Sequence, residues 1–393
     1  MSGHTTGVGD MNSSKKPPFD AARLTALMDK FEFDLLLVST RHNTRYLTGG
    51  YYYPLYMWDA HARRTQYLSF LGIPRGGLDD SFFVGRPGET EVMREADVWI
   101  PQCYEGEQIA SLSTAARAVE VLKKRNLDSA RIALELPSLP ADVFKMLEAQ
   151  LPQAEFVDAV PLMDKLRAVK RPEEIEIVRE GTKKNQEALA AVLTSGRDGA
   201  ATAEIAQQVA GEFTKRGLHF LYALVCAGPS FFRAPSESRH WRRNRILHID
   251  AGGMVDGYIV ELCRMGFLGR RPSGPAEDLM QGCRDLENAV LPSLRPGAEA
   301  SAVQRSAEAF LEGYPLGEYG KFIAHGIGLV HHEDPVINGS SSDRLEEGNL
   351  LSIEMEFRTP EVGHVKVEDM VLITSSGNEV LSPGGGDWFI SNP

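Results

Sequence analysis

The sequence has few cysteines, no long apolar run and no excess of positive charge, and each absence excludes a class of protein. Its four cysteines are scattered over 393 residues with no CxxC spacing, so we expect no disulfide framework and a reducing, cytoplasmic location. No apolar stretch reaches the roughly 18–20 residues of a membrane-spanning helix. The net charge of −12 would repel the phosphate backbone of a nucleic acid. We therefore predict neither a membrane nor a nucleic acid as partner.

One short basic stretch, RHWRRNR (239–245), departs from the acidic balance of the chain. It lies directly before an apolar segment, and we interpret it as a solvated rim. The alternative is that it recognises an anion or carboxylate at the entrance of a site.

The length of the chain exceeds what one hydrophobic core usually supports, so two domains are expected. Residues 1–20 offer little to bury and lack the apolar core of a secretory signal, which predicts a flexible tail. Residues 21–160 mix helical and strand patterns, which predicts an α/β domain. Residues 161–393 begin with helical segments and continue mainly as strands and turns, which predicts an α+β domain. Helices are expected at 21–32, 107–126, 140–150, 172–194, 202–216 and, as a pair, near 275–312.

A predicted hairpin at 245–267 carries two carboxylates. If Val255 and Asp256 form the centre of its turn, Asp250 faces Glu261 across the two strands. Opposed carboxylates repel one another unless a positive group lies between them. A divalent cation is the simplest such group. The alternative is an arginine that spans the pair, and Arg264 is near enough in sequence to do so.

A second predicted hairpin, at 350–374, repeats this arrangement. With its turn centred on Glu361, Glu354 faces Glu368. Both carboxylates lie among apolar residues, where an unpaired charge is costly.

Histidines follow in the segment FIAHGIGLVHHEDP (322–335). His325 precedes two glycines that allow close backbone packing, and His332 lies seven residues further on. Neutral imidazole is a common ligand of transition metals. A lone strand carboxylate or histidine is more often structural, but two carboxylate pairs and a histidine in one domain together indicate a metal site.

These motifs resemble those of the methionine aminopeptidase, aminopeptidase P, prolidase and creatinase superfamily. The resemblance rests on the spacing from Asp250 to Arg264, on HGIGLVHHEDP, and on the segments SIE (352–354) and KVEDMVLIT (366–374). It covers about 160–375, and residues before it resemble the accessory domain of the creatinase branch. The fold it implies is an α/β N-terminal domain followed by an α+β pita-bread catalytic domain.

The resemblance also implies a site and an activity. The metal ligands would be Asp250, Glu261, His325, Glu354 and Glu368, holding two divalent ions (Mn, Fe, Co or Zn). Catalysis would involve His325, Glu354 as proton acceptor and His332 as oxyanion stabiliser, and the substrate would contact His240, Tyr258 and Lys366. Strand alternation places His248 on the same face as Asp250, so it is a further candidate for substrate contact, and the equal alternative is a buried imidazole with its hydrogen bonds satisfied. The implied function is metal-dependent hydrolysis of a peptide or amide bond, with Xaa-Pro dipeptides as default substrates, by a homodimer.

Three departures from the family pattern leave alternatives open. Glu261 replaces an aspartate and could disrupt the site so far that no metal binds. Lys366 replaces an arginine. Residues 226–240 lack the asparagine of proline-specific peptidases and have Pro235 about where their histidine lies, so that His240 is the only histidine of this segment that could substitute for it. The alternative function is therefore hydrolysis or lysis of a small non-peptide metabolite, as in creatinase, ectoine hydrolase or dimethylsulfoniopropionate lyase. A non-catalytic binding protein of the histone-chaperone type is disfavoured because the ligands are retained.

An aromatic segment, YYYPLYMW (51–58), lies in the N-terminal domain. We interpret it as a core or dimer-interface stripe. The alternative is an aromatic wall that holds a cationic substrate through cation–π contacts.

Overall fold

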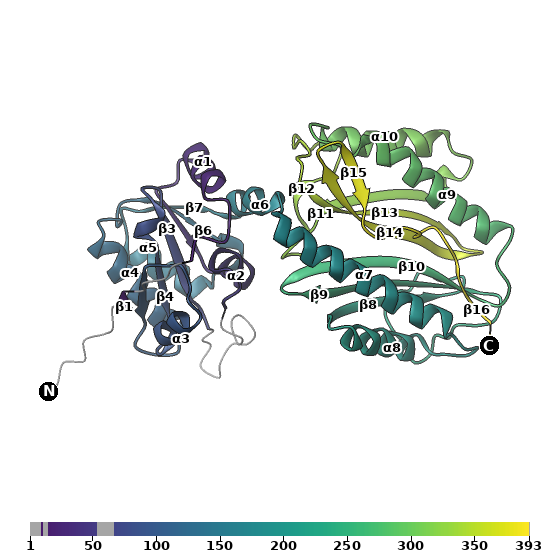
Figure 1. The fold of residues 1–393 in the computed structure, drawn as a ribbon, viewed down its shortest axis with the longest axis horizontal. Helices are drawn as coiled ribbons and strands as arrows, with labels where there is room; N and C mark the ends of the chain where they lie inside the picture. Colours follow the sequence, from purple (N-terminus) through teal and green to yellow (C-terminus); the bar gives the residue numbers. More distant parts are fainter. Residues whose placement is uncertain (1–8, 11–14, 53–66, 393) are drawn as a thin grey trace. The chain divides into compact units, whose positions relative to one another are not determined.

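The computed structural model describes residues 9–10, 15–52 and 67–392 (Figure 1). The chain divides into two compact units, Met1–Leu166 and Arg167–Pro393. Of the predicted tail, residues 1–8 and 11–14 lie outside the described residues, as does most of the aromatic segment. The described part is not a flexible tail, because Gly9 and Asp10 pair with Cys103 and Gln102 in a sheet and Phe19 is buried. Of the aromatic segment, Tyr51 donates a hydrogen bond of 2.8 Å to Glu89, and the guanidinium of Arg41 lies 4.5 Å from the ring centroid of Tyr52. No helix in the described ranges is long and apolar enough to cross a membrane.

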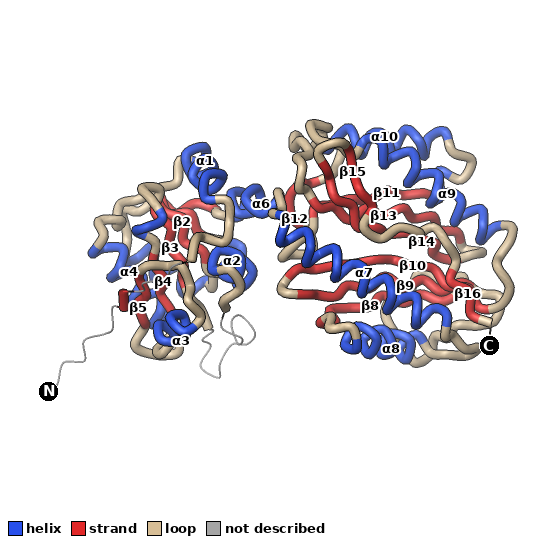
Figure 2. Tube along the Cα trace, in the orientation of Figure 1, coloured by secondary structure: helices blue, strands red, loops and turns tan. Residues whose placement is uncertain are grey.

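The first unit is a mixed sheet with helices around it (Figure 2). Its described residues form seven strands in the order β1-β5-β4-β3-β2-β6-β7. The strands are β1 (Gly9–Asp10), β2 (Leu35–Val38), β3 (Phe70–Pro74), β4 (Phe82–Gly85), β5 (Gln102–Glu105), β6 (Arg131–Leu134) and β7 (Glu155–Asp158). The helices are α1 (Ala21–Phe31), α2 (Arg41–Thr48), α3 (Glu89–Glu95), α4 (Ser111–Lys124), α5 (Ala141–Gln150) and α6 (Val160–Ala168).

Local chemistry sets the ends of these helices. The side chain of Asp20 accepts a hydrogen bond of 2.9 Å from the backbone N–H of Arg23, which caps α1 where the pattern predicts its start. Helix α4 begins at Ser111, four residues after the predicted start at 107, because Ser113 Oγ accepts from the N–H of Gln108 and holds the preceding residues in a turn.

The second unit is one large, mostly antiparallel sheet. Its described residues form nine strands, seven of them in the order β12-β11-β13-β14-β10-β9-β8, with β15 beside β14 and β16 beside β10. The strands are β8 (His219–Ala227), β9 (Ile246–Val255), β10 (Tyr258–Leu268), β11 (Gly320–Gly326), β12 (Glu333–Val336), β13 (Leu350–Thr359), β14 (Gly363–Thr374), β15 (Gly377–Val380) and β16 (Phe389–Ser391).

Four long helices pack on this sheet in two pairs. Helices α7 (Pro172–Thr194) and α8 (Thr202–Lys215) contact β8, β9 and β10, and α9 (Pro275–Val290) and α10 (Ala300–Gly313) contact β11, β13 and β14 (Figure 1). Pro172 occupies the first turn of α7, as predicted, and Glu174 accepts a hydrogen bond of 2.9 Å from the N–H of Arg171.

Side chains alternate across this sheet and separate an apolar face from a polar one. On β13, Ile353, Met355 and Phe357 join the hydrophobic core with α9 and α10. Glu354 and Glu356 lie between them in sequence and therefore project to the opposite face. The polar face carries the residues that the sequence singled out.

Candidate metal centre

The predicted pairing of the first hairpin is wrong by two positions. Its turn residues are Asp256 and Gly257, at φ 45° and 84°, and not Val255 and Asp256. Both residues have positive φ, as the type I′ turn preferred by Asp-Gly requires. Asp250 consequently faces Cys263, while Glu261 faces Gly252. The shift is an even number of residues, so Asp250 and Glu261 still share one face, as diagonal neighbours.

The second hairpin has the predicted register, with Glu354 opposite Glu368. The two hairpins join side by side because β14 pairs with β10 through Glu368 and Cys263. A row of directly paired residues therefore crosses the sheet: Asp250, Cys263, Glu368 and Glu354. His325, on β11, pairs with Ser352, two residues from Glu354 on the same face. Five adjacent strands thus each bring one predicted ligand to the polar face.

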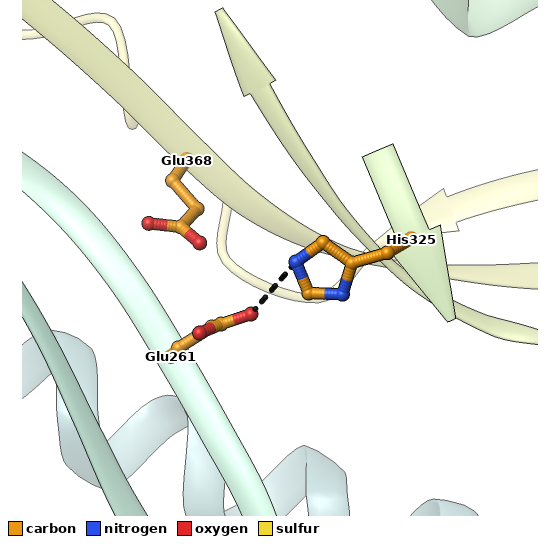
Figure 3. A group of neighbouring side chains, drawn as sticks. All are labelled: Glu261, His325 and Glu368. Carbon is orange, nitrogen blue, oxygen red and sulfur yellow. Dashed lines mark ion pairs between the residues drawn. The ribbon is translucent and has the colours of Figure 1, made fainter. Parts of the chain in front are cut away.

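Three of these ligands converge most closely (Figure 3). Glu261, His325 and Glu368 each offer a ligand atom, and these atoms lie within 4.8 Å of one another. All three residues are buried. Glu261 Oε1, His325 Nε2 and Glu368 Oε2 have no hydrogen-bond partner among the described residues. Buried polar atoms are rarely left without one, so the cluster is suited to a bound cation.

The histidine is oriented to act as a ligand. His325 Nδ1 lies 3.1 Å from the carbonyl oxygen of Gly326, which can only accept, so Nδ1 carries the proton and Nε2 presents its lone pair. Nε2 lies 3.4 Å from Glu261 Oε1 and 3.6 Å from Glu354 Oε1. Ligand atoms at about 2.1 Å from one ion are separated by roughly 3.0–3.4 Å at the usual angles. The spacing of Nε2 and Glu261 Oε1 fits a shared ion.

The second oxygen of Glu261 is already held. Tyr222 donates a hydrogen bond of 2.8 Å to Glu261 Oε2, and His331 Nε2 also contacts that oxygen. Burial alone would raise the pKa of Glu261, but the contact with His331 and the other neighbouring groups outweigh it and lower the pKa. Glu261 is therefore a carboxylate with only Oε1 free.

Lys366 lies on the other side of the carboxylate row. Its ammonium nitrogen is 2.8 Å from Asp250 Oδ2, 2.5 Å from Glu354 Oε2 and 3.1 Å from Glu368 Oε2. Burial alone would lower the pKa of Lys366, but the carboxylates of Glu368, Asp250 and Glu354 raise it well above its usual value. A lysine, and not the arginine that we considered, thus joins carboxylates of the two hairpins. Arg264 instead pairs with Asp369 at 2.7 Å.

The pKa values of Glu354 and Glu368 shift in opposite directions in this arrangement. Burial alone would raise the pKa of Glu354, but cationic neighbours including Lys366 lower it to about 2. Burial, with the charges of Asp250, Glu261 and Glu354, raises the pKa of Glu368 well above its usual value, despite Lys366. Crowded carboxylates of this kind are stabilised by a cation.

The four carboxylates among the predicted ligands border a cavity of about 310 Å³. His332 also lines it, and its ring stacks on His325 with 3.8 Å between centroids. Lys366 lines it as well, as do nine residues that the sequence did not single out: Tyr222, Leu224, Arg233, Lys321, Ile323, His331, Glu356, Arg358 and His364. The adjacent His331 and His332 were visible in the sequence, but Tyr222 and Arg233 lie near Asp250 and Glu261 only through the pairing of β8 with β9.

Three residues predicted to contact the substrate lie outside the cavity lining. His248 is fully buried and stacks on His364, with 4.4 Å between centroids. Tyr258 is buried and donates to Glu174 at 2.6 Å, so it joins β10 to α7. His240 is exposed, and its backbone forms a β-bridge with Ala201. Of the four residues predicted for the substrate, the structure brings only Lys366 to the cavity.

Comparison with known proteins agrees with this geometry. Residues 21–169 match the creatinase/prolidase N-terminal domain, and residues 176–375 match metallopeptidase family M24. The predicted resemblance and the predicted two-part fold are confirmed by these matches.

Curated relatives extend over nearly the whole chain. A putative dipeptidase of Bacillus subtilis, YkvY, is 25% identical over 90% of this chain and 94% of its own. An Xaa-Pro dipeptidase of Pyrococcus horikoshii is 22% identical over 92% and 95%. Among solved structures, a dipeptidase of Pyrococcus horikoshii OT3 superposes with a TM-score of 0.79 at 22% identity, over 95% of this chain and 99% of that one. Since the M24 match spans more than half of the chain and includes all five predicted ligands, the chain belongs to metallopeptidase family M24.

Proposed function

We propose that this chain is a divalent-metal-dependent peptidase that hydrolyses Xaa-Pro dipeptides. The observation that carries the proposal is the convergence of ligand atoms of the buried Glu261, His325 and Glu368 within 4.8 Å of one another, with Glu261 Oε1 and His325 Nε2 lacking hydrogen-bond partners among the described residues. Carboxylate and imidazole donors suit Mn, Fe, Co or Zn. A bound ion would lower the pKa of a coordinated water and polarise the scissile carbonyl.

The residues around this cluster have suitable protonation states. Neighbouring His325 and Lys366 lower the pKa of Glu354 to about 2 against the effect of burial, so it is ionised at neutral pH, as a metal ligand must be. Burial, with His325 and His331 nearby, lowers the pKa of His332. A neutral His332 whose ring stacks on His325 can donate a hydrogen bond to a developing oxyanion.

The volume of the cavity and the cationic residues that line it favour a small substrate with a carboxylate group. Its volume of about 310 Å³ lies at the small end of ligand pockets. Arg233, Lys321 and Arg358 also line it and could pair with the free carboxylate of a dipeptide. The preference for proline is proposed from relatives that are named Xaa-Pro dipeptidases. Homodimer formation and a cytoplasmic location stay predictions from the sequence.

The test uses protein depleted of metal by a chelator and then reloaded separately with Mn²⁺, Fe²⁺, Co²⁺ or Zn²⁺. We expect proline release from Xaa-Pro dipeptides only after reloading, and little turnover of Ala-Ala. His325→Ala and Glu261→Ala should lose both bound metal and turnover. His219→Ala, at an exposed position on β8, is the matched control and should keep both. Full turnover of the His325→Ala protein would contradict the proposal, and absence of peptide hydrolysis by every loaded form would favour the small-metabolite alternative.

A further inference from the structure

The ammonium of Lys366 contacts three of the five predicted ligands. We infer that it takes the place of a second metal ion, so that this chain binds a single divalent ion, between Glu261, His325 and Glu368. The inference rests on the proposed metal dependence and replaces the two ions that the family resemblance implies.

The geometry of Lys366 is that of an internal cation. An ammonium group has three N–H donors. Its nitrogen has three carboxylate neighbours, Asp250, Glu354 and Glu368, at 2.5–3.1 Å. Only 3% of the lysine side chain is exposed, so water cannot readily replace these contacts. Lys366 also lies two residues before Glu368 on β14, and strand alternation places both on the polar face.

Glu261 lies on the other side of the carboxylate row. It is contacted by Tyr222 and by two histidines, and no lysine or arginine of the described residues forms an ion pair with it. The atoms without hydrogen-bond partners, Glu261 Oε1 and His325 Nε2, lie on this side. The predicted ligands therefore form two groups that share Glu368. Asp250, Glu354 and Glu368 contact the ammonium of Lys366, whereas Glu261, His325 and Glu368 converge without it.

Charge balance favours one ion. The four predicted carboxylate ligands, Asp250, Glu261, Glu354 and Glu368, are all at least nine-tenths buried. Against these four, Lys366 supplies a buried positive charge and the partly exposed Arg233, 3.4 Å from Asp250 Oδ2, supplies another. One divalent ion supplies two more, while the buried Glu356 of the same cavity has its own partner in His364. A second ion would leave an excess of positive charge, or would have to displace the ammonium from all three carboxylates, which is costly for a buried cation.

The test counts metal ions and does not depend on turnover. Metal-free full-length protein is loaded with excess Mn²⁺, freed of unbound ion by gel filtration and analysed for Mn²⁺ per chain. Electron paramagnetic resonance of the same sample separates an isolated Mn²⁺ from two ions coupled through a shared carboxylate. We expect about one ion per chain and an uncoupled spectrum, against about two and a coupled spectrum for a dinuclear centre.

Lys366→Met removes the ammonium while keeping a side chain of similar length. It frees the three carboxylates, so the ion count should rise from about one to about two per chain, with the coupled spectrum. Lys321→Met is the matched control, because Lys321 is an exposed lysine that lines the same cavity. It should leave the count unchanged.

The outcomes separate this inference from the proposed function. Two coupled ions in the unaltered protein would overturn the inference and leave the metal-dependent peptidase standing. No bound ion in folded protein would overturn both. A Lys366→Met protein that still binds a single ion would show that Lys366 does not exclude the second one. If that variant does not fold, the count and spectrum of the unaltered protein decide.

Discussion

The hydroxyl of Tyr222 lies 2.8 Å from Oε2 of Glu261 and donates a hydrogen bond to it. Tyr222 belongs to β8, at the edge of the sheet, and Glu261 to β10, one strand beyond β9. Burial, together with the charge of Glu261, raises the pKa of Tyr222, so the hydroxyl keeps its proton. The hydrogen bond holds one carboxylate oxygen and leaves the other free for a metal ion.

Tyr222→Phe should therefore weaken metal binding. The substitution removes the hydroxyl that orients Glu261, and loss of such a partner typically costs about 10- to 100-fold in metal affinity. The measurement is titration of metal-free protein with Mn²⁺ in competition with a chelator of known affinity. Tyr319→Phe, at an exposed site, is the control. Equal affinity in the Tyr222→Phe protein would show that the hydroxyl does not position the ligand.

The two adjacent histidines should have separable roles. His332 lines the cavity and forms no ion pair with a carboxylate of the described residues, whereas His331 Nε2 contacts Glu261 Oε2. We expect His332→Gln to lower kcat by about 10²- to 10³-fold on an Xaa-Pro dipeptide, at unchanged metal content. His331→Gln should mainly weaken metal affinity. Steady-state kinetics and metal analysis are measured on both variants. Weaker metal affinity in His332→Gln, with a lower kcat at unchanged metal content in His331→Gln, would show that the two roles are exchanged.

The sequence was sufficient for the longer helices and for much of the site, but not for the short helices α2, α3 and α6. Period-two patterning predicted both hairpins, and the register of Glu354 and Glu368 is confirmed. The other register failed because the turn lies at Asp256-Gly257, but Asp250 and Glu261 still share a face. A shift of two residues leaves every side chain of the strand on the same face of the sheet. The face of a residue can therefore be predicted more securely than its partner on the neighbouring strand.

The rest of the site depends on contacts that have no local signal in the sequence. Nothing in either hairpin reveals that β14 pairs with β10 through Glu368 and Cys263. That pairing brings Lys366 to Asp250, 116 residues away in sequence. Glu261 and Lys366 were both noticed as departures from the family pattern, yet their partners could be found only from the assembled sheet.

The Asp-Gly turn of the first hairpin should contribute to stability. Gly257 has φ 84°, a conformation that costs a residue with Cβ roughly 1–2 kcal/mol. We expect Gly257→Ala to lower the free energy of unfolding by about that amount in urea denaturation. Gly211→Ala is an informative control: Gly211 lies inside α8, with no atom within 4 Å of an added Cβ, so alanine should stabilise by about 0.5–1 kcal/mol. An unchanged stability of the Gly257→Ala protein would mean that the turn relaxes without cost.

Glu333 should stabilise the second unit through a buried ion-pair network. Its carboxylate lies 2.7 Å from Lys170 Nζ and 3.1 Å from Arg167 Nε, and all three side chains are buried. Glu333→Gln removes the negative charge that Lys170 and Arg167 share at this position, and breaking a buried ion pair on one side typically costs about 3–5 kcal/mol. Glu204→Gln breaks the exposed pair with Arg197 and should change stability by less than about 1 kcal/mol. Urea denaturation at neutral pH measures both.

The network of Glu333 with Lys170 and Arg167 also predicts how the stability difference between the unaltered and Glu333→Gln proteins depends on pH. Burial alone would raise the pKa of Glu333, but the charges of Lys170 and Arg167 outweigh it and lower the pKa. Because the folded-state pKa lies below the unfolded value of about 4.3, the stabilisation is fully present above that value and is lost as pH falls through the folded-state pKa. The stability difference between the unaltered and Glu333→Gln proteins should therefore stay constant from about pH 7 to pH 5 and shrink in more acidic solution. A difference that grows on acidification would contradict the assignment, because it would require Glu333 to be protonated more easily in the folded protein than in the unfolded chain.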